Sequence, residues 1–185
     1  SFHLPIVGLA VLPLTLGEPL IFLPIQIIFL ELICDPVSVI GFEKEKAPRN
    51  IMRLPPRVMT ESLIPPTLWR QVTVQALAIF GICIALYFYY SRWLHDLETA
   101  RAMAFGALVA SQTWLVFFTR EWYQVRHNFV LSGIGLATIA ALFVIFYLPQ
   151  MRYLFHFPQV SLWQFFAMLG VTFVFIGIIG TLTKR

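Results

Sequence analysis

The chain has 185 residues, of which 59% are hydrophobic and only 12% charged, and its formal net charge is +4. Soluble domains carry about 25% charged residues, so this composition excludes an ordinary soluble domain and indicates an integral membrane protein. The basic residues gather in loops between apolar runs, which argues for a role in membrane topology and against a nucleic-acid surface.

Six apolar segments follow one another and predict an all-α bundle of six transmembrane helices. They cover about residues 2–16, 19–42, 68–90, 99–119, 129–148 and 160–182. A membrane-spanning helix needs ~20 apolar residues, which every segment after the first provides. The first is short, and we interpret it as the second half of a helix that begins upstream. Small residues at helical spacing predict close helix crossings at Gly106–Ala110 and at Gly133–Ala137–Ala141.

Two carboxylates, Glu31 and Asp35, lie inside the second apolar segment, directly before Pro36. An acid at the bilayer centre costs roughly 2.5–3.5 kcal/mol on insertion scales, and residues four apart share one helical face. Pro36 has no N–H and its ring clashes with the Leu32 carbonyl, so we expect one unwound helix near Glu31–Pro36 with that carbonyl freed. Carboxylate and carbonyl oxygens are ligands of hard cations. The pattern therefore predicts a cation or proton pathway.

Two further polar side chains, His3 and Gln112, lie within apolar segments. Each has two interpretations: a hydrogen-bonded packing residue, which is the commoner case, or a cation ligand. Pro5 loosens the helix beside His3 and favours the second interpretation slightly. Cys34, between the two acids, could offer a soft ligand, but the flanking carboxylates favour a hard ion, so we interpret Cys34 as a wall residue.

The distribution of basic residues predicts the sidedness of the bundle. Loop 43–67, loop 120–128, Arg70 and the C-terminal tail together carry most of them, whereas Arg92, Arg101 and Arg152 fall on the other side. By the positive-inside rule, loop 43–67 and the C-terminus are expected in the cytoplasm.

From His3 to about Arg57 the chain resembles the fifth and sixth membrane helices, and the loop after them, of type II P-type cation-transporting ATPases. It is most similar to the bacterial, calcium-pump-like members. The resemblance is carried by the runs Leu23-Pro24-Ile25-Gln26, Leu30-Glu31-Leu32-Ile33-Cys34-Asp35-Pro36 and Pro55-Pro56-Arg57. The later segments resemble the four C-terminal helices of that family in number, length and sidedness.

The resemblance implies that Asp35 and Glu31 bind the transported cation on an unwound sixth helix. His3 falls where the family often has an amide ligand, and Ile6 where the calcium pumps have a glutamate. Gln112 falls where their eighth helix offers a carboxylate. The implied metal ligands are therefore Asp35, Glu31, the Leu32 carbonyl, His3 and Gln112.

The implied function is the cation-binding membrane portion of an ATP-driven pump in the plasma membrane. Calcium is the first expectation for the transported divalent cation, and magnesium and manganese also suit oxygen ligands. The sequence contains no Walker loop and no Asp-Lys-Thr-Gly-Thr phosphorylation motif. We therefore expect no catalytic or nucleotide-binding residues in this chain, and ATP to act only through other domains.

The expected partners are the lipid bilayer, helices one to four of the pump, and a cytoplasmic phosphorylation domain against loop 43–67. The chain is then the C-terminal membrane part of a pump, either a piece of it or the product of a split gene. Two alternatives remain open. One is a self-contained proton- or cation-coupled carrier or channel that uses Glu31 and Asp35 as a relay. The other is a module that only completes a membrane bundle.

Overall fold

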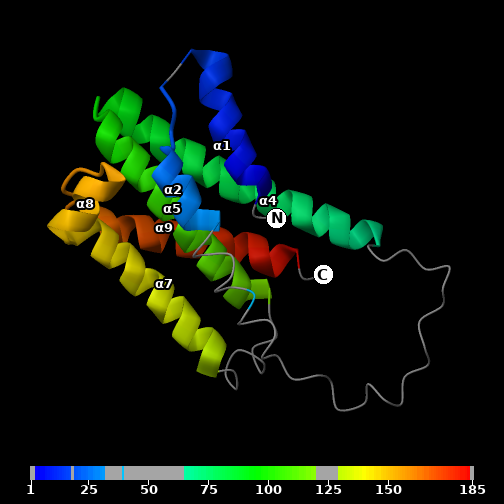
Figure 1. Cartoon of the computed structure of the whole chain (residues 1–185). Coiled ribbons are helices and arrows are strands. Elements are labelled where there is room, and N and C mark those ends of the chain that lie inside the picture. The colour runs from blue at the N-terminus through cyan, green and yellow to red at the C-terminus, as the bar shows by residue number, and fades with distance from the viewer. Residues whose placement is uncertain (1–2, 18, 32–38, 40–64, 120–128, 184–185) are drawn as a thin grey trace.

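The computed structural model describes residues 3–17, 19–31, 39, 65–119 and 129–183, and these are helical or lie in short connections, with no strand among them. The helices are α1 (His3–Leu16), α2 (Pro24–Phe29), α4 (Pro66–Phe88), α5 (Leu97–Thr119), α7 (Phe129–Tyr147), α8 (Pro149–Phe155) and α9 (Leu162–Leu182), shown in Figure 1. A π-helical turn, η3 (Tyr89–Trp93), continues α4.

Four helices within these ranges are long and apolar enough to cross a membrane: Pro66–Trp93, Leu97–Thr119, Phe129–Tyr147 and Leu162–Leu182. They correspond to the last four predicted segments. The all-α membrane fold expected from the sequence is thereby confirmed. The first predicted segment is present as α1, a shorter apolar helix.

The second predicted segment differs from the expectation, because α2 begins at Pro24 and not near residue 19. Proline suits the first helical position, where its missing N–H is not needed. The Gln26 side chain accepts a hydrogen bond of 3.1 Å from the Leu23 backbone N–H, which closes the helix start. At the other end, Leu30 and Glu31 form a π-type turn. The predicted unwinding near Glu31–Pro36 falls on residues 32–38, outside the described residues.

Helix α5 lies at the centre of the bundle and packs against both α4 and α9 (Figure 1). All residues from 102 to 111 are buried. Gly106 allows close approach, since a Cβ there would lie 2.6 Å from the Met168 sulfur, and this agrees with the crossing predicted at Gly106. Among the described residues, a Cβ at Gly133 would meet nothing within 4 Å, and Gly135 instead lies against the Phe117 ring. The close crossing predicted at Gly133 is therefore not formed within the described ranges.

The connections place alternate helix ends together. In Figure 1 the first residues of α4 and α7 and the last residues of α5 and α9 each lie lower and further right than the opposite ends of the same helices. Helix α8 and the first residues of α5 and α9 lie toward the upper left. This is the alternation that a multi-pass bundle requires. The cytoplasmic location of one end stays a prediction.

Candidate functional site

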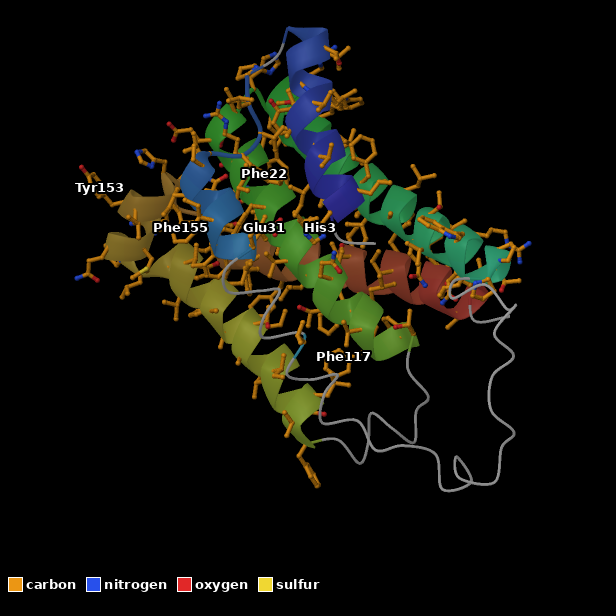
Figure 2. The ribbon with its side chains drawn as sticks, turned by 45° about the vertical axis from the view of Figure 1, so that its right-hand side comes forward. His3, Phe22, Glu31, Phe117, Tyr153 and Phe155 are labelled. Atoms are coloured by element: carbon orange, nitrogen blue, oxygen red, sulfur yellow. The ribbon has the colours of Figure 1, made fainter. Side chains whose placement is uncertain are left out.

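His3 and Glu31, at the start of α1 and just after α2, lie side by side in the structure (Figure 2). The Nε2 atom of His3 is 3.4 Å from the Oε2 atom of Glu31, and the two side chains are 69% and 42% exposed. Two residues that the sequence places 28 positions apart are thus in one site. The imidazole and the carboxylate can share a proton or a cation.

This pair lies near the middle of the bundle and not at one of its ends. Leu30, next to Glu31, lines a cavity of about 30 Å³ together with Val109 and Gln112, which belong to the central part of α5. Five residues after His3 in α1, Gly8 packs against the ring of Phe80, about halfway along the span Pro66–Trp93. A helix that crosses the bilayer holds its centre in hydrocarbon, so we expect Glu31 to be a carboxylate at membrane depth.

Gln112 faces the cavity beside Leu30. Its amide nitrogen is buried and has no hydrogen-bond partner among the described residues. The two threonines that line the same cavity are satisfied within their own helices: Thr113 donates to the Val109 carbonyl at 3.0 Å, and Thr138 to the Ile134 carbonyl at 2.9 Å. The interhelical hydrogen bond expected from a packing glutamine is therefore not formed within the part of the chain that the structure describes.

The other two predicted ligands, Asp35 and the Leu32 carbonyl, lie outside the described residues, as does Cys34. Within residues 3–17, 19–31, 39, 65–119 and 129–183, no three His, Cys, Asp or Glu side chains gather as a metal centre would require. The described part of the site thus offers His3 and Glu31, with Gln112 close behind them beyond Leu30.

Sequence reasoning missed the residue that holds this site in place, Gln26. Its side chain is completely buried, and its Nε2 atom donates a hydrogen bond of 2.9 Å to the backbone carbonyl of Phe155 in α8. Its Oε1 atom accepts from the Leu23 N–H, so both ends of the amide are used. A glutamine inside an apolar segment must find partners, because an unpaired buried amide is costly, and that was the signal available.

Aromatic packing fixes the same short helix from another side. The Phe29 ring lies 6.0 Å from that of Phe105 and 5.4 Å from that of Phe155, and Phe22 meets Phe105 edge-on at 6.3 Å. Figure 2 shows Phe22 and Phe155 on either side of α2. Such ring pairs contribute about 0.5–1.5 kcal/mol each beyond area burial. Helix α2, which leads to Glu31, is therefore held against α5 and α8 from both ends, by Phe22 before its first residue and by Phe29 at its last.

Comparison with known proteins places this geometry in a family. Residues 19–185 match the family model described as "Cation transporting ATPase, C-terminus". The chain is 26% identical over 166 residues to a protein named calcium-transporting ATPase from Bacillus subtilis (strain 168), covering 85% of this chain and 18% of that protein. It is also 26% identical over 150 residues to calcium-transporting ATPase 1 from Lactococcus lactis subsp. lactis (strain IL1403), covering 77% of this chain and 17% of that protein.

The chain thus spans less than a fifth of the length of these relatives. The family match extends over α2 and every helix after it, including the π-type turn at Glu31 and the cavity beside Gln112. The chain belongs to the cation-transporting ATPase C-terminal family, and its helices are the C-terminal membrane region of a P-type ATPase.

Proposed function

We propose that this chain binds the transported cation in the membrane portion of an ATP-driven pump. Calcium is the leading candidate for that cation. The observation that carries the proposal is the His3–Glu31 pair, 3.4 Å apart, beside the central part of α5. The two relatives named above are calcium-transporting by name. A lone carboxylate at that depth is costly, and a bound divalent cation or a proton offsets the cost.

In this proposal Glu31 and Asp35 are the charged ligands, and the Leu32 carbonyl, His3 and Gln112 complete the set. Asp35 follows Glu31 by four residues in the sequence, so it is the second acid of the same segment. In Gln112 the ligand would be the amide oxygen, because the amide nitrogen, which has no partner in the described structure, only donates hydrogen bonds. An ion that approaches past Leu30 would give that amide a role.

The energy comes from domains outside this chain. Phosphorylation of a cytoplasmic domain shifts the membrane helices between two states, and the site differs in ion affinity between them. Helix α2 is held by the Gln26 hydrogen bond and, at its last residue, by the contact of Phe29 with Phe155, so the position of Glu31 in either state depends on α8. Protons replace the ion on the return step, because bare carboxylates at that depth are unfavourable.

The partners of this chain follow from what its surface leaves open. Leu4, Val7 and Val11 form an apolar face of α1 that is 50% exposed or more, beside the exposed imidazole of His3. We propose that the remaining membrane helices of the pump cover this face and close the ion site, while lipid covers the outer helices. We also propose that the pump lies in the plasma membrane and that loop 43–67 docks on the phosphorylation domain in the cytoplasm.

The test is ion-dependent phosphorylation of the complete pump by ATP. We expect Asp35→Asn to abolish phosphoenzyme formation at low calcium and Glu31→Gln to require much more calcium. Glu98→Gln is the matched control, because Glu98 is an exposed acid in the first turn of α5, at the end of the bundle. Wild-type phosphoenzyme levels in Asp35→Asn at low ion concentration would contradict the proposal.

The two alternatives give different results. Ion flux through liposomes that contain this chain alone, without ATP, would favour a self-contained carrier or channel, and we expect none. A module that only completes the bundle predicts that the double variant Glu31→Gln, Asp35→Asn leaves transport by the complete pump intact. We expect that variant to be inactive.

A further inference from the structure

We infer that the imidazole of His3 makes this site favour first-row divalent transition ions, relative to a site built from oxygen ligands alone. The inference rests on the proposed function, because it concerns the selectivity of the same ion site. It is carried by the contact between His3 and Glu31 and by the composition of α1.

The spacing of the pair suits a shared ion. Two ligand atoms that each lie about 2.1 Å from one metal ion are roughly 3.0–3.5 Å apart for right-angled to tetrahedral arrangements. The His3 Nε2 and Glu31 Oε2 atoms are 3.4 Å apart. This distance is longer than the N–H···O optimum of about 2.9–3.0 Å. The two atoms are thus already at ligand spacing, and an ion can bind between them with little rearrangement.

Helix α1 supplies nitrogen to this site in place of oxygen. Apart from His3, its sequence from His3 to Leu16 contains no His, Cys, Asp, Glu, Asn or Gln. Ile6, on the same helical face three residues further on, is apolar and buried. The only strong donor that α1 can bring next to Glu31 is therefore the imidazole ring.

Nitrogen and oxygen donors select different ions. Ca²⁺ takes six to eight oxygen ligands and gains little from an imidazole nitrogen. Zinc and the later first-row ions bind imidazole together with carboxylate, and affinity for such mixed sites generally rises from Mn²⁺ toward Zn²⁺. Relative to the affinity for Ca²⁺, His3 should therefore raise the affinity for Mn²⁺ slightly and the affinity for Zn²⁺ more.

The first experiment compares His3→Asn with wild type in the complete pump, measuring the apparent affinities for Ca²⁺, Mn²⁺ and Zn²⁺ from phosphoenzyme formation. Asparagine keeps a polar side chain but offers oxygen. We expect His3→Asn to lower the Zn²⁺/Ca²⁺ affinity ratio by about tenfold or more, and the Mn²⁺/Ca²⁺ ratio by less. His95→Asn is the matched control: His95 is exposed, and its positive φ of 54° is one that asparagine tolerates. Its ratios should equal those of wild type.

The second experiment reads the ligand directly, by electron spin-echo spectroscopy of Mn²⁺ bound to the pump. Wild type and His95→Asn should show coupling to a coordinated imidazole nitrogen, and His3→Asn should lack it. Bound Mn²⁺ without nitrogen coupling in wild type, or ion ratios that His3→Asn leaves unchanged while Ca²⁺ still drives phosphorylation, would overturn this inference alone. Phosphorylation of wild type that depends on no ion would overturn the proposed function and the inference with it.

Discussion

The side-chain amide of Gln26 donates to the backbone carbonyl of Phe155 at 2.9 Å, across 129 residues of sequence. This bond joins α2 to α8 in the buried part of the bundle. A helix of six residues such as α2 is far too short to be stable by itself, because helix nucleation is unfavourable. Tertiary contacts must hold it, and Gln26 provides the polar one. The position of Glu31 thus depends on a helix near the other end of the chain.

Gln26→Leu is expected to destabilise the bundle. The change leaves the Leu23 N–H and the Phe155 carbonyl without the amide that each now uses, and a buried unsatisfied group costs about 1–3 kcal/mol. The melting temperature in detergent should fall, and the calcium concentration needed for phosphorylation of the complete pump should rise. Gln150→Leu is the control, because Gln150 is exposed on α8. Equal melting temperatures for Gln26→Leu and wild type would contradict the anchoring role.

Gly180→Ala is expected to separate α9 from α5. A Cβ at Gly180 would lie 2.7 Å from the Cβ of Phe118, an atom that no side-chain rotation can move away. Overpacking of this kind typically costs about 1–3 kcal/mol. Gly170→Ala, in the same helix, meets nothing within 4 Å and should be neutral or slightly stabilising, since alanine favours helix. Reversible unfolding in mixed micelles measures both, and a similar stability for the two variants would argue against close packing at Gly180.

The long helices could be predicted because a bilayer leaves a buried apolar segment few alternatives to a helix. The start of a helix that depends on side-chain contacts could not be predicted in this way. Residues 19–42 read as one apolar run, yet α2 begins at Pro24, where the side chain of Gln26 closes the first turn. Helix α8 was not expected at all. Its seven residues are too few to form a stable helix alone, and its contact with Gln26 of α2 cannot be read from its own sequence.

Small residues show the same limit. The prediction of a close crossing at Gly106 is confirmed, because that glycine packs against Met168 and Phe146. The stripe that begins at Gly133 makes no such crossing in the described structure, and Gly135 takes that role against Phe117. Spacing along a helix shows that a narrow face exists, but several faces of α7 carry small residues. Which of them meets α5 depends on the shape of the partner helix.

The site was predictable as far as its chemistry is visible in single residues. Glu31 and His3 stand out as polar groups in apolar segments, and the structure brings them together. Asp35 and Leu32 stay predictions, since they lie outside the described residues. Gln26 is also a polar residue in an apolar segment. Its role, however, depends on a backbone carbonyl in α8 that no local sequence pattern indicates. Sequence distinguishes a buried polar residue from its neighbours, but not a ligand from an anchor.

Gln112 can be assigned to one of these roles by replacing it with leucine. If its amide serves only packing, the loss of a buried N–H that has no partner in the described structure should leave ion dependence unchanged. We expect instead that Gln112→Leu keeps or raises the melting temperature without ion, because the unsatisfied group is removed. The calcium required for phosphorylation should rise by about tenfold, equivalent to roughly 1.4 kcal/mol of binding free energy.

Thr113→Val is the matched control for this variant. Thr113 lines the same cavity, and its hydroxyl already donates to the Val109 carbonyl within α5, so its replacement removes no unpartnered donor. Its replacement should leave the calcium dependence of phosphorylation as in wild type. An equal rise in the calcium requirement for both variants would mean that the cavity acts through its shape, because Gln112 has the only side-chain amide among its described lining residues. A rise confined to Gln112→Leu assigns the effect to that amide.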